Sequence, residues 1–397
     1  MIIAADHVVT PSGVLRPGWV RVAGPVIEAV GAGAPPGGAA RDARADLHGA
    51  WALPGFVDMH VHGGGGASFT EGDADAVRAA VAFHRRHGTT AIIASLVTAP
   101  AGELASRASM LAGLADQGVI DGIHLEGPFL SVARCGAQDP HSILPGDPDL
   151  LRRLLHAAGG AVRSMTLAPE TSRLGEVLDV LAASHVTPSY GHTDASAAVT
   201  RAAIDAAGGG PLGATHLFNA MPPLHHRAPG PAGACLAAAA RGAMVVELIG
   251  DGLHLAEDTV AMVFALIGPN SIALVTDAMA AAGMPDGRYP FGPMTVDVVD
   301  SVARLATDDG TEGAIAGGTA RLIDVLRRTV LEAGVPLPDA VTAATATPAR
   351  LIGLDAEVGD VVPGRRADLL ITDDDLMPRA VMRAGRWVHG ALFEEVH

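Results

Sequence analysis

The sequence predicts an α/β fold: a (β/α)8 TIM-like barrel with a small β-sandwich formed by the N- and C-terminal segments. Eight short apolar runs alternate with helical patterns between residues 54 and 357. The chain of 397 residues is longer than the roughly 250 that one such barrel needs, so a second, smaller unit is expected. Strand-like runs broken by glycine and proline occupy both ends of the chain and would build that unit.

The predicted barrel strands are apolar along nearly their whole length, as expected of parallel strands that are buried on both faces. They are Gly55–His60, Thr90–Val97, Ile120–Leu125, Ser164–Ala168, Val186–Tyr190, Gly213–Leu217, Met244–Ile249 and Ile272–Thr276. Helical patterns fall between them at Asp73–His87, Leu104–Gln117, Leu174–Ala183, Ala195–Ala207 and Glu257–Ile267. Eight parallel strands joined by helices close into a barrel, and the catalytic groups of such barrels lie at the C-terminal ends of the strands.

The two ends of the chain are predicted to meet in one β unit. Their strand-like runs are Met1–Ala5, Trp19–Val22 and Val26–Val30, followed near the other end by Ala367–Thr372 and Ala380–Val388. We therefore expect a discontinuous β-sandwich domain made of residues 1–53 plus 358–397, and a (β/α)8 barrel domain made of residues 54–357.

Composition and charge limit the partners of the chain. It is 49% hydrophobic and 18% charged, which is typical of a soluble globular enzyme. A net charge of -16 provides no basic stripe to neutralise phosphates, so neither nucleic acid nor an anionic membrane is expected as a partner. A small phosphorylated substrate is not excluded, because one or two local arginines suffice to bind a phosphate.

All 27 basic residues are arginine, and the sequence contains no lysine. This excludes Schiff-base chemistry, a phosphate-loop lysine and a metal site bridged by a carboxylated lysine. A GC-rich genome would also favour alanine, glycine and arginine, but the chemical exclusions hold for either origin.

Cysteine usage and the N-terminus indicate the compartment. Cys135 and Cys235 are too few for a disulfide framework and fit a reducing environment. The start of the chain lacks a basic segment followed by an apolar stretch, so no signal peptide is expected. The apolar run Val260–Ile267 is far too short to span a membrane. We therefore expect a cytoplasmic protein.

The most informative local pattern is His60-Val61-His62, where a predicted strand meets a glycine-rich loop. Two histidines at positions i and i+2 of a strand point to the same face, so both imidazoles can reach one metal ion. Such a pair is weak support on its own, since many pairs only form hydrogen bonds in a core. Four further imidazole or carboxylate residues also follow apolar runs, namely Glu126, His192, His216 and Asp277.

At the ends of barrel strands these six side chains would converge on one mouth. Imidazole and carboxylate ligands suit zinc, iron(II) or manganese and do not discriminate sharply among them. Six ligands leave room for two ions, with Glu126 as the bridge. Any one of these residues alone would be explained as a polar core residue, but their shared position at strand ends favours a metal centre.

Several longer segments resemble a known family. They are Pro54–Gly63, His124–Phe129, Leu167–Glu170, Gly191–Thr193, Thr215–Met221, Asp251–His254 and Val275–Ala278. Together they are similar to the N-acetylglucosamine-6-phosphate deacetylases of the amidohydrolase superfamily, and the resemblance covers essentially the whole chain. Asn219–Met221 and Leu125–Pro128 are specific to the deacetylase branch, whereas His60-Val61-His62 and the tail from Thr347 to Asp368 occur throughout the superfamily.

The resemblance implies a metal centre with one or two divalent ions per subunit. We expect zinc, with iron, manganese or cobalt as alternatives. The implied ligands are His60, His62, Glu126, His192, His216 and Asp277. The glutamate and the two later histidines would be the primary set, and the first two histidines match members that hold a second ion. Asp277 would also be the general acid/base.

The resemblance also implies a substrate pocket. Its phosphate site would be formed by Arg227, His254 and the backbone at Asn219 and Ala220, with Arg227 or His254 supplied across a homodimer interface. An arginine fork matches a phosphate with two hydrogen bonds, and histidine adds a donor. The other substrate-binding residues implied are Gln138, Asp251, Ile315, Ala316 and Gly317.

One position departs from the family pattern. Some relatives place a sugar-contacting histidine twelve residues after the bridging glutamate; this sequence has Gln138 there, and His141 three residues later. Glutamine can hydrogen-bond a hydroxyl or a carbonyl but cannot carry charge. We favour Gln138 over His141 as the substrate contact, and we take Cys135, in the same loop, as an ordinary thiol.

The implied activity is hydrolysis of N-acetylglucosamine 6-phosphate to glucosamine 6-phosphate and acetate. The metal would supply hydroxide at neutral pH, and Asp277 would pass the proton of water to the departing amine. A glutamate-bridged deaminase or a cyclic-amide hydrolase of the same superfamily is the alternative enzyme. A barrel that has lost catalysis is the alternative from another class. The sequence leaves open the metal, the number of ions and the choice between glucosamine and galactosamine.

Overall fold

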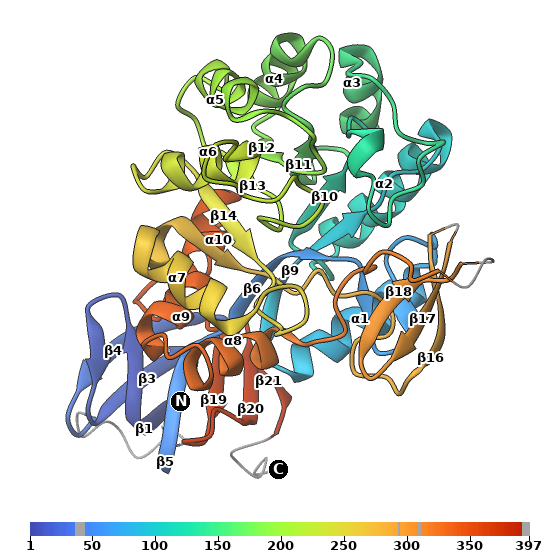
Figure 1. Cartoon of the computed structure of the whole chain (residues 1–397). Helices are drawn as coiled ribbons and strands as arrows, with labels where there is room; N and C mark the ends of the chain where they lie inside the picture. The colour runs from blue at the N-terminus through green and yellow to red at the C-terminus, as the bar shows by residue number, and fades with distance from the viewer. Residues whose placement is uncertain (36–43, 293, 308–310, 391–397) are drawn as a thin grey trace.

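An eight-stranded parallel barrel forms the centre of the protein (Figure 1). The structure is a computed structural model that describes residues 1–35, 44–292, 294–307 and 311–390. In spatial order the barrel strands are β6 (Phe56–Val61), β9 (Thr89–Leu96), β10 (Gly122–Glu126), β11 (Val162–Leu167), β12 (Thr187–Tyr190), β13 (Gly213–Ala214), β14 (Val245–Leu248) and β15 (Ile272–Leu274). Each pairs in parallel with the next. The predicted barrel is thus confirmed.

The first and last barrel strands meet through residues at their C-terminal ends. Val61 and Ala278 form a parallel bridge. Deeper in the barrel, the Thr276 hydroxyl donates a hydrogen bond of 2.6 Å to the Asp58 carboxylate. Burial raises the pKa of Asp58 to about 7, although the hydrogen bonds from Thr276 oppose this. The closure brings the histidines of β6 next to the residues that follow β15.

Helices pack around the barrel (Figure 1). They are α1 (Ala74–Arg86), α2 (Ala101–Asp116), α3 (Pro148–Ala157), α4 (Leu174–Ala183), α5 (Ala197–Ala206), α6 (Gly230–Ala239), α7 (Glu257–Ile267), α8 (Leu322–Leu331), α9 (Leu337–Ala344) and α10 (Ala346–Leu351), with short 3-10 turns η1 (Val132–Arg134) and η2 (Pro269–Ser271). The predicted bounds of α4 and α7 are those of the structure. Within the described residues, no helix combines the length and apolar character needed to cross a membrane.

The sequence prediction omits α3, although the residues at its N-terminus favour the start of a helix. The Asp147 carboxylate accepts hydrogen bonds from the N–H groups of Asp149 and Leu150. Pro148 takes the first helical position, where its fixed φ and missing N–H cost nothing. The sixth strand is also shorter than predicted, because the chain leaves the ladder before His216, whose φ is 28°.

The two ends of the chain form one mixed sheet beside the barrel (Figure 1). Its strands are β1 (Ile2–Thr10), β2 (Gly13–Leu15), β3 (Gly18–Ala23), β4 (Val26–Ala32), β5 (Arg44–Pro54), β19 (Leu369–Thr372), β20 (Pro378–Arg383) and β21 (Arg386–His389). β1 and β5 pair in parallel, and the other pairs are antiparallel. A separate apolar cluster that includes Ile3, Val20 and Leu369 forms its core. The predicted β unit built from both termini is confirmed.

Two parts of this sheet differ from the prediction. The range Ala380–Val388 is wrong as a single strand, because the chain reverses at Ala384 and Gly385. Their φ values of 49° and 76° make the turn between β20 and β21. The long strand β5 is absent from the prediction, and its last residue, Pro54, lies just before the first barrel strand.

A three-stranded antiparallel sheet is inserted between the last barrel strand and α8. It consists of β16 (Gly287–Phe291), β17 (Met294–Val299) and β18 (Val302–Leu305). It packs beside the barrel mouth through an apolar cluster that includes Val97, Met279 and Phe291. A small hairpin, β7 (Gly63–Gly64) and β8 (Ala67–Ser68), also follows the first barrel strand. The sequence prediction contains neither element.

Removing the hydroxyl of Thr276 tests the closure of the barrel. In Thr276→Val the buried Asp58 carboxylate loses a donor at 2.6 Å. A hydrogen bond to a charged group contributes roughly 1.5–3 kcal/mol, so we expect the free energy of unfolding of the metal-free protein to fall by about 2 kcal/mol at pH 8, measured in urea. Thr329→Val is the matched control, because the buried Thr329 hydroxyl bonds to the Val325 carbonyl of its own helix. An equal loss in both variants would contradict a special role for the closure.

Candidate metal centre

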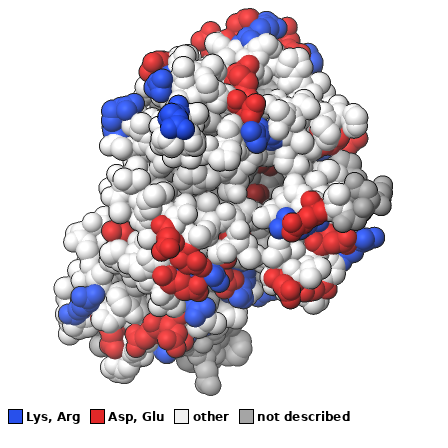
Figure 2. Space-filling view, in the orientation of Figure 1, with Lys and Arg blue, Asp and Glu red and all other residues white. Residues whose placement is uncertain are grey.

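A cavity of ≈ 260 Å³ opens at the barrel mouth. Polar side chains from the ends of barrel strands and apolar side chains from the inserted sheet line it together. The lining residues are Glu126, Gly136, Ala137, Gln138, His192, His216, Asn219, Ala220, His254, Asp277, Phe291, Ala314, Ile315 and Gly317. Figure 2 shows a recess between the barrel and the inserted sheet, with acidic side-chain atoms inside it.

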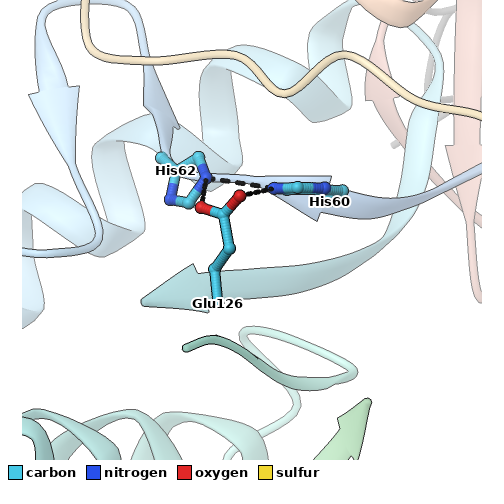
Figure 3. A group of neighbouring side chains, drawn as sticks. All are labelled: His60, His62 and Glu126. Carbon is cyan, nitrogen blue, oxygen red and sulfur yellow. Dashed lines mark hydrogen bonds and ion pairs between the residues drawn. The ribbon is translucent and has the colours of Figure 1, made fainter. Parts of the chain in front are cut away.

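His60 on β6, His62 directly after this strand and Glu126 at the end of β10 form a first group of metal-type ligands (Figure 3). The Nε2 atoms of His60 and His62 are 3.2 Å apart. Glu126 Oε2 lies 3.3 Å from His62 Nε2, and Glu126 Oε1 lies 3.6 Å from His60 Nε2. All three side chains are buried, so water screens their charges poorly.

Glu126 also belongs to a second group, with His192 and His216. Its Oε1 atom lies 3.0 Å from His192 Nε2 and 3.2 Å from His216 Nε2, and the two Nε2 atoms are 3.1 Å apart. Within each group the ligand atoms all lie within 4.8 Å of one another, so one ion can contact all three. The two groups therefore indicate a centre for divalent metal ions, with one carboxylate shared between them.

Asp277 lies beside the first group. Its Oδ1 atom is 3.2 Å from His62 Nε2 and 3.4 Å from His60 Nε2. Burial alone would raise the pKa of Asp277, but the neighbouring His60 and His62 lower it to about 2. The side chain is therefore a carboxylate at neutral pH and can accept a proton.

In two of the histidine rings, the contact of Nδ1 shows which ring nitrogen carries the proton. His62 Nδ1 donates to the Ser95 carbonyl at 3.2 Å. His192 Nδ1 donates to the Arg134 carbonyl at 2.9 Å. A carbonyl oxygen can only accept, so each Nδ1 carries the proton, and in a neutral ring Nε2 then carries a lone pair.

The facing lone pairs repel one another unless a cation lies between them. His60 Nδ1 lies 2.9 Å from the Glu247 carboxylate, so the Nε2 of this ring also points inward as an acceptor when the ring is neutral. These nitrogens, with the carboxylate oxygens of Glu126 and Asp277, form a buried cluster of acceptors. Imidazole nitrogens oriented from behind, together with carboxylate oxygens, are the donor set that fits a divalent cation.

The pKa shifts show the same attraction for positive charge, which a proton on His60 can supply when no metal ion is bound. Burial would lower the pKa of His60, but three carboxylates, of which Asp277 acts most strongly, raise it well above the usual value. Burial would raise the pKa of Glu126, but His60 and the histidines that bond to it lower it well below the usual range. Glu126 and Asp277 therefore stay ionised, and the site attracts positive charge.

Three of the predicted ligands occupy strained backbone. The φ values of His192, His216 and Asp277 are 46°, 28° and 47°. Non-glycine residues seldom adopt this region, and such strain gathers at functional sites where the surroundings enforce it. Each of the three follows a short barrel strand, so the turn there directs the side chain into the mouth instead of continuing the sheet.

Known proteins share this fold and these residue patterns. The model of the amidohydrolase family matches residues 51–388. The chain is 34% identical to the N-acetylglucosamine-6-phosphate deacetylase of Bacillus subtilis (strain 168), covering 81% of each chain. It is 34% identical to that of Homo sapiens, covering 87% of this chain and 85% of the relative. The chain belongs to the N-acetylglucosamine-6-phosphate deacetylase family of amidohydrolases.

A solved structure extends this comparison to nearly the full length of the amidohydrolase. It is a variant of the N-acetyl-D-glucosamine-6-phosphate deacetylase from Mycobacterium smegmatis in complex with N-acetyl-D-glucosamine-6-phosphate. The two chains are 45% identical with a TM-score of 0.91, covering 98% of this chain and 99% of the other. An N-acetylgalactosamine-6-phosphate deacetylase of Escherichia coli O157:H7 is 32% identical, covering 85% of this chain and 86% of the relative.

Most of the predicted substrate-binding residues line the cavity of this amidohydrolase. They are Gln138, Asn219, Ala220, His254, Ile315 and Gly317. Ala316 is fully buried between the last two. Asp251 lies behind His254, and its carboxylate accepts a hydrogen bond of 2.8 Å from His254 Nδ1. Burial lowers the pKa of His254, but Asp251 raises it above the usual value, so the ring tends to be a cation that can donate from Nε2 into the cavity.

Arg227 is not among the lining residues of the cavity. Arg227 is an exposed residue, and its backbone N–H donates to His225 Nδ1 at 3.2 Å. Within one copy of the chain, the guanidinium therefore does not complete the predicted phosphate site.

Gln138 holds the shared carboxylate. Its Nε2 donates to Glu126 Oε2 at 2.6 Å, and its Oε1 accepts from the Thr98 N–H at 2.7 Å. One N–H of the amide remains for a ligand, so Gln138 can donate to a substrate oxygen while its carbonyl is already engaged. His141 is exposed and does not line the cavity, so Gln138 is the one of the two that reaches the site.

His124 lies behind the first group and is neutral. Its Nδ1 lies 2.9 Å from the Ser95 hydroxyl, and its Nε2 lies 2.8 Å from the Thr166 hydroxyl. Burial lowers its pKa well below the usual value, and the charge on His60 lowers it further. With both nitrogens engaged, the ring supports His60 edge-on, with the ring centroids 4.6 Å apart.

Sequence reasoning missed residues on two sides of the site. Phe291 and Ala314 line the cavity from the inserted sheet and the segment after it, and the Phe291 ring packs against His62 with centroids 5.6 Å apart. Nothing in the sequence marks these two as site residues. Glu247 stands behind His60 on β14, and a charged residue inside the apolar run Met244–Ile249 is a signal that could have identified it.

Replacing Gln138 tests whether it positions the shared carboxylate. In Gln138→Leu, Glu126 loses a donor at 2.6 Å and the buried Thr98 N–H loses its acceptor. Loss of such a supporting bond typically weakens metal binding roughly 10- to 100-fold, and we expect a change of that size in the Zn²⁺ affinity, measured by competition with a chelator. His141→Ala is the control, since His141 is exposed outside the cavity. Unchanged affinity in Gln138→Leu would contradict the positioning role.

Proposed function

We propose that the chain hydrolyses N-acetylglucosamine 6-phosphate to glucosamine 6-phosphate and acetate. The main support is the position of Asp277, whose carboxylate lines the cavity beside His60 and His62. A base next to a cation site is what hydrolysis of an unactivated amide requires. The 45% identity to a deacetylase solved with N-acetyl-D-glucosamine-6-phosphate supports the choice of substrate.

His60, His62 and Glu126 would hold one divalent cation, and Glu126 would share a second with His192 and His216. We propose zinc, with iron, manganese or cobalt as alternatives, because imidazole and carboxylate ligands suit all of them. A cation bound there polarises the amide carbonyl and lowers the pKa of water, which supplies hydroxide at neutral pH.

Asp277 would move the proton during the reaction. As a carboxylate it takes a proton from the attacking water when the new C–O bond forms at the acetyl carbon. It returns this proton to the amine nitrogen as the C–N bond breaks, because an amine anion is a poor leaving group. The products are acetate and the free amino sugar.

The phosphate would bind at His254 and at the backbone of Asn219 and Ala220. These residues line the cavity, and Asp251 raises the pKa of His254, which favours the charged form of its ring. Gln138 would donate one N–H to the substrate. The segment Ile315, Ala316 and Gly317 would lie along the sugar.

We also propose a homodimer in which Arg227 of one copy completes the phosphate site of the other. An arginine fork suits a phosphate, yet Arg227 is exposed and outside the cavity of its own chain. A neighbouring copy would bring it to the ligand.

Protein purified without added metal provides the test of this function. Elemental analysis gives the metal and the number of ions per chain. Acetate release is measured from N-acetylglucosamine 6-phosphate, N-acetylgalactosamine 6-phosphate and unphosphorylated N-acetylglucosamine. We expect the phosphorylated glucosamine derivative to be hydrolysed at least about tenfold more efficiently than the unphosphorylated sugar, since charged hydrogen bonds are worth roughly 1.5–3 kcal/mol. Equal efficiencies would refute the phosphate site, and a metal-loaded protein that releases no acetate would refute the function.

The variant Asp277→Asn tests the proton-transfer role. An amide has the shape of the carboxylate but cannot take up a proton at neutral pH. We expect kcat to fall by roughly a thousandfold, within the range typical of a lost general acid/base, while the Kd of the substrate changes little. Asp297→Asn, an exposed carboxylate of the inserted sheet, is the control. Near-normal turnover in Asp277→Asn would remove Asp277 from this role.

The variant His254→Asn tests the phosphate contact. We expect KM for N-acetylglucosamine 6-phosphate to rise about tenfold or more, while kcat/KM for the unphosphorylated sugar stays unchanged, because a charged donor is lost. In the unmodified enzyme the advantage of the phosphorylated sugar should fall as the pH rises through the raised pKa of His254, since the ring then loses its charge. His156→Asn, on α3 outside the cavity, is the control. Equal effects on both sugars would contradict the assignment.

A further inference from the structure

Glu247 is a buried carboxylate that touches one ligand of each metal group. It lies on β14 and is only 1% exposed. Its Oε2 atom accepts the Nδ1 proton of His60 at 2.9 Å and the backbone N–H of His216 at 3.0 Å. His60 belongs to the first group and His216 to the second. One oxygen atom thus connects two ligands that are far apart in the sequence.

The contact to His60 sets the direction of that ring. With the proton of Nδ1 held by Glu247, the lone pair of Nε2 points toward Glu126 and Asp277. In the described chain, the corresponding partners of His62 and His192 are backbone carbonyls, which are neutral. A carboxylate in this position makes the imidazole a stronger ligand than a carbonyl does, because its charge stabilises the positive charge that the ring acquires on binding a metal.

The contact to His216 restrains strained backbone. The φ of His216 is 28°, and its N–H donates to the side chain of Glu247 on the neighbouring strand β14 instead of to a backbone carbonyl. The next residue is held by the same segment, because the Leu217 N–H donates to the Glu247 carbonyl at 2.9 Å. Backbone and side chain of Glu247 together fix the turn that directs His216 into the mouth.

We propose that Glu247 is the positioning residue that couples the two metal groups: its charge strengthens the first, and its acceptor oxygen fixes the turn that presents the second. The inference rests on the proposed metal-dependent function, but it concerns cation binding in the absence of substrate.

Two variants separate the charge from the hydrogen bonds. In Glu247→Gln an amide oxygen can still accept from His60 and His216, but the charge is gone. We expect the first group to bind its cation about 10- to 100-fold more weakly, as is typical when a supporting partner is lost, while the second stays near the unmodified affinity. In Glu247→Leu both hydrogen bonds are lost, and we expect both groups to bind more weakly.

The measurement is a titration of metal-free protein with Co²⁺, followed by its visible absorption, and with Zn²⁺, followed by calorimetry. The unmodified chain should show two binding steps, Glu247→Gln one unchanged and one weakened step, and Glu247→Leu two weakened steps. Asp368→Asn is the matched control, since Asp368 is a buried carboxylate that pairs with Arg366 away from the cavity. Circular dichroism and thermal melting of each metal-free protein establish that it is folded.

Each outcome decides the proposal. Two unchanged steps in both variants, or the same loss in Asp368→Asn, would overturn it. If Glu247→Leu does not fold, Glu247→Gln alone decides it through the ratio of the two affinities, which a general loss of stability does not change selectively. If the folded, metal-loaded enzyme fails to release acetate from any amino sugar, the proposed substrate is wrong, while the metal titration still tests Glu247.

Discussion

The shared carboxylate of Glu126 is the constraint on which the rest of the site depends. One buried group faces nitrogens of four histidines, and those histidines stand on or after strands β6, β12 and β13. Only a closed parallel barrel brings the C-terminal ends of strands so distant in the sequence to one mouth. An open sheet would leave the first strand and the last one on opposite edges, and Asp277 could not lie beside His60 and His62.

Concentrating acceptors in a dry pocket is unfavourable unless the surroundings hold them and a cation neutralises them. The framework holds four of the candidate ligands through contacts from behind, whereas the buried Nδ1 atom of His216 has no hydrogen-bond partner among the described residues. Gln138 holds Glu126, backbone carbonyls hold His62 and His192, and Glu247 holds His60. The same framework enforces the positive φ values near the mouth, which the local chain would not adopt by itself. The geometry of the candidate metal centre therefore depends directly on the barrel around it.

The sequence was sufficient to predict what depends on local pattern, and insufficient for what depends on pairing across the barrel. Apolar runs locate the strands, and a polar residue at the end of such a run marks a candidate metal ligand, as at Glu126. The side chain that contacts a candidate ligand depends on strand register and on the curvature of the barrel. The hydrogen bond from Gln138 to Glu126 could therefore not be predicted from the sequence. The prediction of a single strand at Ala380–Val388 is wrong because Ala384 and Gly385 form a turn. The apolar residues on both sides of this turn make it hard to recognise in the sequence. The inserted sheet was missed because its strands are short and half exposed.

Chemistry and shape come from different parts of the chain. The groups of the candidate metal centre lie at the ends of barrel strands, whereas Phe291, Ala314 and Ile315 belong to the inserted sheet and the segment that pairs with it. That sheet packs on the barrel through its own small apolar cluster, apart from the main core. A change of side chain there would alter the wall of the cavity, and a change at Phe291 would also alter the packing of His62. The barrel therefore carries the candidate metal ligands, and the insertion shapes one wall of the cavity.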